Sequence, residues 1–261
     1  MILKHPDLSP DYPIIDRRRT EKLYKDEFKR HLRAYDLTPA DLQGKRILDI
    51  ASGLELYFPI AAAMAGFENV YSLDIRKTPL IQKAEALHYH EAKLYPHLRR
   101  VKENIPPKIL ESVKQKYVQA NAEKLPFKDQ SFDLILSRYA IPLILLPERK
   151  KAARQAIQEI LRVLKNNGQF RFFSVEENFS LKENIPKELE KFLVKFMAKN
   201  VALNELLEKM AQEKLLEYET KNVYQKTTKY FRPKNKEGLL AYQNIRQMKI
   251  IRKVKATEKR K

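Results

Sequence analysis

Short apolar runs alternate with amphipathic stretches along the first two thirds of the chain. Four of the runs have the length and composition of strands that are buried on both faces of a parallel sheet. They cover residues 47–50, 70–75, 134–137 and 169–175. Between and around them, apolar residues recur with the spacing of helices that pack one face against a sheet. These stretches cover residues 16–35, 59–65, 78–94, 107–116 and 147–164. The alternation predicts an α/β fold, a doubly wound and mostly parallel sheet with helices on both faces.

The stretch 46–76 reads as strand, tight loop, helix and second strand. The small residues 51–53 break the first apolar run, Pro59 fits an early helical turn, and Gly66 ends the helix. The second strand carries Asp74 near its end. A βαβ unit of this kind places a loop and a helix N-terminus beside a carboxylate at the carboxyl edge of the sheet. That arrangement suits a ligand with an adenosine ribose at one end.

The length of 261 residues is enough for one domain with additions. We expect a lead helix within 1–42, a core at 43–175 with a helical insertion at about 95–112, and helices and edge strands at 176–261 that complete the same domain. The final two strands are predicted at 215–218 and 248–254. The helix at 147–164 is predicted to end in a left-handed cap formed by Asn166-Asn167-Gly168.

Positive charge dominates the composition, with 52 Lys and Arg against 33 Asp and Glu, a formal net charge of +19. Such a balance favours nucleic acid, an acidic membrane surface or another anionic partner. Solvated lysine-rich faces explain it equally well. The basic residues gather in the lead helix and at the end of the chain. They are Arg17, Arg18, Arg19, Lys22, Lys25, Lys29, Arg30 and Arg33, and then Arg246, Lys249, Arg252, Lys253, Lys255, Lys259, Arg260 and Lys261.

The chain contains no cysteine, which excludes disulfides, thiolate metal sites and a cysteine nucleophile. This fits a reducing compartment. The first ten residues lack the apolar segment of a signal peptide, and no run reaches about 18 apolar residues. We therefore expect a cytoplasmic protein with no membrane span and no metal site.

The most specific motif lies between residues 117 and 146. It reads Asn121-Ala122-Glu123-Lys124-Leu125-Pro126-Phe127, then Asp129, Ser131, Phe132 and Asp133, and it is followed by the apolar strand 134–137. This run resembles the (Gly)-Asp-Ala-Glu-x-Leu-Pro-Phe-x-Asp-x-Ser-Phe-Asp sequence of methyltransferases similar to the ubiquinone/menaquinone-biosynthesis enzymes. Only Asn121 departs from it, where the family has an acid.

The first loop resembles the acid-x-Gly-x-Gly-x-Gly pattern of class I S-adenosylmethionine-dependent methyltransferases. Asp49 and Gly53 match the pattern, whereas Ala51 and Glu55 replace two glycines. An alanine at position 51 strains the loop if that residue needs a positive φ. Four elements resemble those of the family in the right order, from residue 45 to 175.

The resemblance implies a seven-stranded Rossmann-like sheet with an antiparallel edge and S-adenosyl-L-methionine as cofactor. Carried over residue by residue, it assigns cofactor binding to Asp49, Ala51, Ser52, Gly53, Asp74, Ile75, Asn121, Ala122, Glu123 and Ser137. In this reading Asp74 takes the ribose hydroxyls, the loop 51–53 faces the methionine part, and Ala122 and Glu123 border adenine. Arg138 and Tyr139, just past the fourth strand, are the candidates for the reaction centre.

The methyl acceptor is not identified by these motifs. Attack by a cysteine on pyrimidine C5 is excluded, and Ser137-Arg138-Tyr139-Ala140 stands where amino-nitrogen base methyltransferases have Asn-Pro-Pro-Tyr. We expect a small-molecule acceptor. The alternatives are an RNA-directed enzyme, or a catalytically degenerate basic binding module, which Ala51, Glu55 and Asn121 would suggest.

Overall fold

The computed structural model describes residues 17–53, 56–76, 105–137, 150–174, 202–225 and 244–253. The elements in chain order are α1 (Arg17–Ala34), η1 (Pro39–Leu42), β1 (Ile47–Ile50), α2 (Tyr57–Met64), β2 (Val70–Asp74), α5 (Pro107–Gln115), β3 (Tyr117–Gln119), β4 (Phe132–Ser137), α7 (Lys150–Val163), β5 (Leu164–Ser174), β6 (Leu216–Gln225) and β7 (Asn244–Lys253). Residues 202–212 are also helical. No helix in these described ranges is both long and apolar enough to cross a bilayer.

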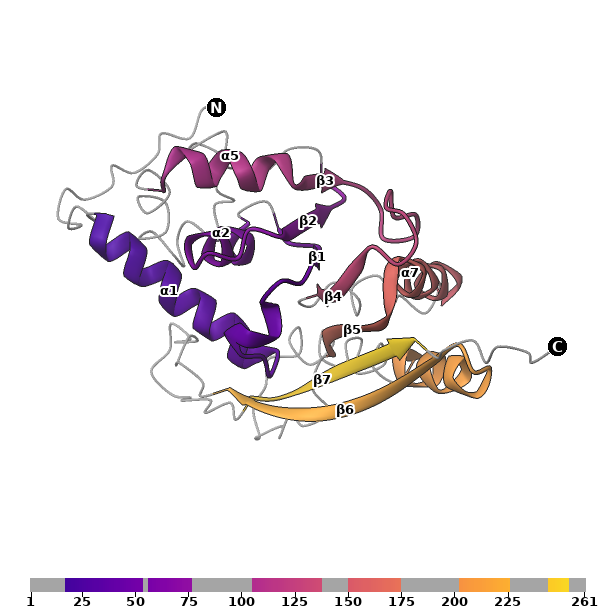
Figure 1. Cartoon of the computed structure of the whole chain (residues 1–261). Helices are drawn as coiled ribbons and strands as arrows, with labels where there is room; N and C mark the ends of the chain where they lie inside the picture. The colour runs from indigo at the N-terminus through magenta and orange to yellow at the C-terminus, as the bar shows by residue number, and fades with distance from the viewer. Residues whose placement is uncertain are drawn as a thin grey trace, which may run out of the picture.

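Seven strands form one sheet in the order β3-β2-β1-β4-β5-β7-β6 (Figure 1). Neighbours from β3 to β5 are parallel, whereas β7 runs antiparallel to both β5 and β6. Strand order reverses beside β1, so the crevice at the carboxyl ends of β1 and β4 is the usual ligand position of such a sheet. The expected seven-stranded, mostly parallel sheet with an antiparallel edge is confirmed.

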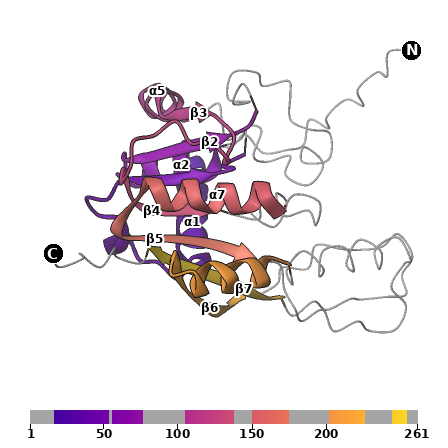
Figure 2. The same cartoon turned by 90° about the vertical axis from the view of Figure 1, so that its right-hand side faces the viewer.

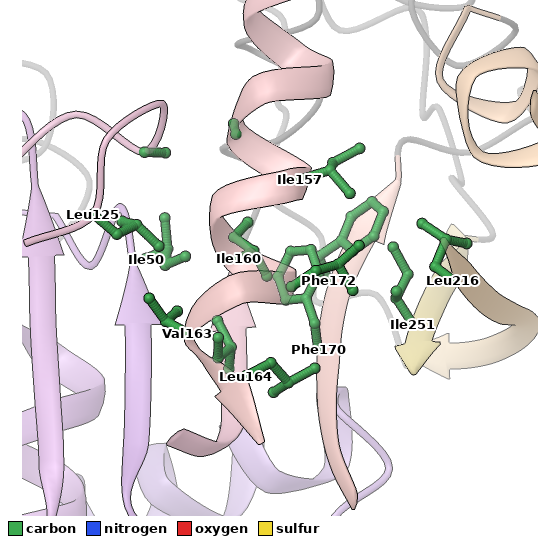
Figure 3. Close-up of a cluster of buried hydrophobic side chains, with 14 of the residues drawn as sticks. Ile50, Leu125, Ile157, Ile160, Val163, Leu164, Phe170, Phe172, Leu216 and Ile251 are labelled. Atoms are coloured by element: carbon green, nitrogen blue, oxygen red, sulfur yellow. The ribbon is translucent and has the colours of Figure 1, made fainter. Parts of the chain in front are cut away.

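Helices cover both faces of this sheet (Figure 2). On one face, α7 packs Ile157 and Ile160 against the strands, in a cluster that includes the stacked pair Phe170 and Phe172 of β5 (Figure 3). These apolar side chains are fully buried, and each contributes on the order of 1.5–3 kcal/mol from its removal from water. The β5 strand is thereby held in a fixed position beside β4.

On the opposite face, α1 packs on α2 and becomes part of the core. The Phe28 ring stacks on Phe58 at a centroid distance of 6.5 Å and on Phe67 at 5.2 Å. Tyr24 and Leu32 are buried in the same cluster. The apolar stripe expected for the lead helix therefore faces α2, and the opposite side of α1 is left to solvent.

The left-handed cap expected at Gly168 is wrong. The helix α7 ends at Val163, and Gly168 lies inside β5 without a positive φ. A Cβ at this position would lie 2.7 Å from Leu164 Cδ1 and 2.9 Å from the carbonyl oxygen of Asp133. Glycine is therefore needed here for the close approach of β5 to the backbone of β4, next to the register shift between these strands.

The final strands are longer than the sequence predicted. Residues 215–218 and 248–254 were expected to be strands, whereas β6 and β7 pair over ten residues each. The helix at 78–94, most of the insertion at 95–112, and the residues Arg138 and Tyr139 lie outside the described residues. The helix at 107–116 is confirmed as α5.

Candidate active site

Three chain segments meet at the carboxyl edge of the parallel strands. Strand pairing aligns Ile50 at the end of β1 with Leu73 of β2 and with Ser137 of β4. The loop 51–53 therefore begins beside the end of β2, where the Ser52 amide donates to the Leu73 carbonyl oxygen at 3.2 Å. The parallel arrangement thus brings together three of the segments that the sequence singled out.

The loop after β1 has an unusual backbone. Ala51, Gly53 and Leu56 have φ values of 55°, 74° and 51°, all in the left-handed region. Glycine adopts this region freely, but a residue with a Cβ pays about 1–2 kcal/mol there. Ala51 therefore adopts a backbone conformation that glycine would adopt at lower cost. The backbone strain expected at this position is present.

Replacing Ala51 by glycine should stabilise the protein by about 0.5–1 kcal/mol. Relief of the left-handed backbone strain should stabilise the folded state by about 1–2 kcal/mol. The greater conformational entropy of glycine in the unfolded chain should offset about 0.4–1 kcal/mol of this gain. Urea unfolding of the two proteins measures the difference. Ala63→Gly in α2 is the matched control, because the same change in a helix should destabilise by about 1 kcal/mol. A loss of stability in Ala51→Gly would contradict the strain.

Asp74 is buried at the end of β2, and its carboxylate accepts four hydrogen bonds. Oδ2 accepts from the Gly53 amide at 3.2 Å and from Arg76 Nη2 at 3.2 Å. Oδ1 accepts from the Arg76 amide at 3.1 Å and from Arg76 Nε at 2.9 Å. Burial acts to raise the pKa of Asp74, but the hydrogen bonds and charge of Arg76 and the Gly53 amide outweigh it, so the pKa is lowered. The carboxylate is therefore ionised at neutral pH and joins the two loops.

An exposed apolar side chain follows the carboxylate. Ile75 is 66% exposed, although it directly follows a buried strand. Its carbonyl oxygen accepts from Gln119 Nε2 at 3.2 Å, and the Arg76 carbonyl oxygen accepts from the Tyr117 hydroxyl at 2.7 Å. Burial, together with the charge of Asp74, raises the pKa of Tyr117 to about 12, so this hydroxyl keeps its proton. The β3 side chains thus hold the backbone that presents Ile75.

The segment 121–123 lies beside the end of β2. The amide of Ala120 donates to the Asp74 carbonyl oxygen at 3.0 Å. Asn121 Oδ1 then accepts from the Glu123 amide at 3.1 Å, which is an Asx turn. An aspartate would make the same turn. The amide at position 121 therefore preserves the local backbone, and Ala122 is buried beneath it.

Two hydroxyls near this edge are buried. Ser137 Oγ at the end of β4 and Ser72 Oγ in β2 have no hydrogen bond within the described part of the chain. Asp49, which is paired with Ser72 across β1 and β2, is also buried. An unsatisfied buried hydroxyl costs about 1–3 kcal/mol. Ser137 therefore offers a polar group that a ligand at this edge could satisfy.

Residues 125–129 of the second motif are held in place by hydrogen bonds from Arg162 of α7. This residue was not identified from the sequence. Its guanidinium donates to the carbonyl oxygens of Leu125 at 2.9 Å and Phe127 at 2.8 Å. It also donates to Asp129 Oδ1 at 2.7 Å and to both carboxylate oxygens of Glu159 at 2.8 Å. The Leu-Pro-Phe-x-Asp run therefore has a structural role, since it docks a loop onto α7. The Glu159-x-x-Arg162 spacing on one helix face was the available signal.

Asp133, the last residue of that motif, is structural as well. Its Oδ2 accepts from the Arg46 amide at 2.9 Å and its Oδ1 from Lys165 Nζ at 2.8 Å. Burial acts to raise the pKa of Asp133, but the Lys165 contact and the Arg46 amide lower it overall. This carboxylate joins the starts of β1, β4 and β5, at the edge opposite Asp74.

A cavity of about 600 Å³ lies at the same opposite edge. It is lined by Leu37, Asp41, Lys45, Gln130, Asp133, Leu134, Lys165, Asn166, Asn167, Gln169 and Arg171. None of the residues predicted for cofactor binding lines it. The carboxyl edge remains the candidate site because that is where the loop, the carboxylate and Ser137 meet.

The comparisons with known proteins concern the same region. Residues 48–172 match the family model of a methyltransferase domain. The uncharacterized methyltransferase YcgJ of Bacillus subtilis is 42% identical over 55 residues, which are 21% of this chain and 19% of that protein. An uncharacterized protein of Haemophilus influenzae is 44% identical over 50 residues, 19% of this chain and 18% of its own length. The chain thus spans about a fifth of the length of these curated relatives.

Solved structures are similar at lower identity. A protein assigned as an S-adenosyl-L-methionine-dependent methyltransferase from Methanococcus maripaludis is 15% identical, with a TM-score of 0.48. The similarity covers 96% of this chain and 99% of that chain.

Proposed function

We propose that residues 48–172, which match the family model of a methyltransferase domain, form a class I S-adenosylmethionine-dependent methyltransferase, and that the protein transfers a methyl group from S-adenosyl-L-methionine to a small-molecule acceptor. The observation that carries the proposal is the carboxyl edge itself. A buried, ionised Asp74 is joined to the loop 51–53 by the Gly53 amide and is followed by an exposed Ile75. We also propose that the protein is cytoplasmic, as expected from the sequence.

The residues at this edge fit the parts of the cofactor. Two carboxylate oxygens suit a vicinal diol, so Asp74 would hold the ribose. Ile75 would cover one face of adenine, and Ala122 and Glu123 would border the base. The loop 51–53 would face the methionine part, while the unsatisfied Ser137 Oγ offers a hydrogen bond at the end of β4.

Little chemistry is required of the protein in such a reaction. The cofactor supplies a methyl group that is already activated on a sulfonium, so the protein contributes alignment and exclusion of water. The buried Asp74, and the backbone to which the Tyr117 hydroxyl donates, would fix the position of the nucleoside. Arg138 and Tyr139 follow β4 directly and remain our candidates for the acceptor side.

The departures from the family pattern favour an active enzyme over a degenerate module. Ala51 adopts the left-handed conformation that a glycine would adopt, and Asn121 makes the turn that an aspartate would make. The substitutions therefore leave the backbone of both segments in place, at the cost of local strain at Ala51.

Calorimetric titration of the purified protein with S-adenosylhomocysteine tests this function. We expect saturable binding of one molecule per chain. S-inosylhomocysteine, which differs at the base, is the control ligand and should bind more weakly because its adenine amino group is lost. No binding of S-adenosylhomocysteine would contradict the function and favour a basic binding module.

A second candidate partner, nucleic acid, is favoured by one face of α1. Five exposed basic residues recur at intervals of four, three, four and four positions, which places them on one side of the helix. They are Arg18, Lys22, Lys25, Lys29 and Arg33. None of the five forms an ion pair with another residue in the described ranges. The row extends over about 22 Å at 1.5 Å per residue.

The surroundings of this basic row favour a phosphate backbone over a membrane. The apolar side of α1 is buried against α2, so it is not available for insertion into lipid. Asp26 is the exposed acid next to the row. At the other basic region, Lys249 Nζ donates to Thr220 Oγ1 and Arg252 pairs with Glu219, so these cations are already engaged. We propose that the basic row on α1 is the surface that binds the phosphate backbone of nucleic acid.

Salt dependence tests the basic row on α1. Replacing Lys22, Lys25 and Lys29 by glutamine should flatten the slope of log K against log salt for single-stranded RNA by about 2, because each neutralised phosphate contributes about 0.7. A matched triple variant, Lys108→Gln, Lys151→Gln and Lys209→Gln, removes the same charge from exposed positions elsewhere and should keep the slope. Equal slopes in the two variants, or no RNA binding, would remove this candidate.

A further inference from the structure

The Arg76 guanidinium forms an ion pair with the Asp74 carboxylate, the group that would bind the ribose of the nucleoside. Its Nε and Nη2 atoms donate to Asp74 Oδ1 and Oδ2 at 2.9 and 3.2 Å, one donor to each oxygen. The two partners differ sharply in exposure, since the arginine side chain is 44% exposed and the aspartate side chain 6%. The carboxylate is therefore fixed, and the guanidinium lies on its solvent side.

The acceptor capacity of Asp74 is fully used by this arrangement. A carboxylate has about four lone-pair positions. The amides of Gly53 and Arg76 fill two of them, and the Arg76 guanidinium fills the other two. A ribose diol that binds Asp74 with both hydroxyls needs two positions, so two of the present donors must leave.

Of these donors, the guanidinium is the one carried by a half-exposed side chain. The Arg76 amide belongs to a backbone segment that is held on both sides, because the Ile75 and Arg76 carbonyl oxygens accept from Gln119 and Tyr117 of β3. The Gly53 amide is part of the short loop whose Ser52 amide is bound to Leu73. The arginine side chain, in contrast, is half exposed and has several rotatable bonds.

We infer that Arg76 occupies the place of the ribose diol in the unliganded protein and is displaced when a nucleoside binds, so that it sets the affinity of the site. This inference rests on the proposed function. Both the guanidinium edge and a vicinal diol present two adjacent donors to a carboxylate, so one can substitute for the other. Each binding event then exchanges an ion pair for two neutral hydroxyl donors.

The exchange predicts an unusual direction for a substitution at a binding site. Replacing Arg76 by methionine keeps an unbranched apolar stem but removes the competing donors. The affinity for S-adenosylhomocysteine should rise by about three- to tenfold, which is the range of a partly exposed bidentate pair. Arg76→Lys, which cannot form the fork, should give an intermediate rise.

Salt gives a second, independent readout. Added salt weakens a half-exposed ion pair. The wild-type affinity for S-adenosylhomocysteine, a ligand without net charge, should therefore increase between 50 and 500 mM salt. The affinity of Arg76→Met should stay constant over the same range. A merely structural role for Arg76 would not produce this difference.

The experiment is a calorimetric comparison of the wild type, Arg76→Met, Arg76→Lys and the Asp74→Asn/Arg76→Met double variant. Arg154→Met is the matched control, because Arg154 of α7 pairs with Glu213, away from the Asp74 site, so its replacement should leave the affinity unchanged. The Arg76→Met gain should disappear when Asp74 is also replaced. Unchanged or weaker binding by Arg76→Met, while the wild type binds, would overturn the inference alone. Absence of binding by both would overturn the proposed function and this inference together.

Discussion

Replacing Asp74 by asparagine should lower the affinity for S-adenosylhomocysteine by about 10- to 100-fold. Hydrogen bonds to a charged acceptor contribute about 1.5–3 kcal/mol each, and the amide keeps only one neutral acceptor oxygen. Asparagine preserves the shape of the side chain, so its oxygen can still accept from the Gly53 amide. The loss should therefore come from the ribose and not from collapse of the loop.

Calorimetry on Asp74→Asn, with thermal unfolding to establish that it is folded, measures this effect. Asp26→Asn, which neutralises an exposed aspartate on α1, is the control and should bind as the wild type does. Because the folded pKa of Asp74 is lowered from 3.8, its charge is present above that value and lost only as the pH falls through the lower folded pKa. The Asp74 contribution to affinity should consequently be constant from pH 8 to pH 5. Wild-type affinity in Asp74→Asn would remove this residue from the site.

The second large effect concerns stability. Replacing Arg162 by methionine should destabilise the protein by about 2–4 kcal/mol, because the carbonyl oxygens of Leu125 and Phe127 and the carboxylate of Glu159 lose their donor together. The pKa of Glu159 is lowered chiefly by its hydrogen bond from Arg162, so its charge would also lose its partner. For a chain of this size the midpoint of thermal unfolding should fall by about 5–15 °C.

Arg154→Met is again the control, since it removes an arginine of the same helix that is equally exposed but pairs with the single carboxylate of Glu213. Exposed pairs of this kind contribute about 0–1 kcal/mol, so its midpoint should change little. Similar midpoints for the two variants would contradict the role of Arg162 in docking the 125–129 loop.

The order of the elements and the parallel core could be predicted from the chain, because each depends on local patterns. The apolar runs of β1 and β2 and the small residues between them sufficed to place Asp74 at the carboxyl edge. The antiparallel edge followed from the family resemblance. The lengths of β6 and β7 could not be predicted, because exposed polar residues such as Thr220 and Lys221 interrupt the apolar pattern of the strand.

Other features depend on contacts that no local pattern records. Gly168 follows two asparagines at the end of a helical stretch, which is typical of a cap, but its role is the close approach to the Asp133 carbonyl oxygen on another strand. The spacing of Glu159 and Arg162 indicates a pair on one helix face, but it does not indicate that Arg162 also contacts a loop more than 30 residues away. For Arg76, the sequence places a basic residue after the acid but does not indicate that it fills the acceptor sites of that acid.

The direct test of the account is a crystal structure of the protein with S-adenosylhomocysteine. We predict both ribose hydroxyls within hydrogen-bond distance of the Asp74 carboxylate, adenine against Ile75, and the Arg76 guanidinium withdrawn from Asp74. A nucleoside bound elsewhere, such as in the cavity beside Lys45 and Asp133 at the opposite edge, would contradict the account.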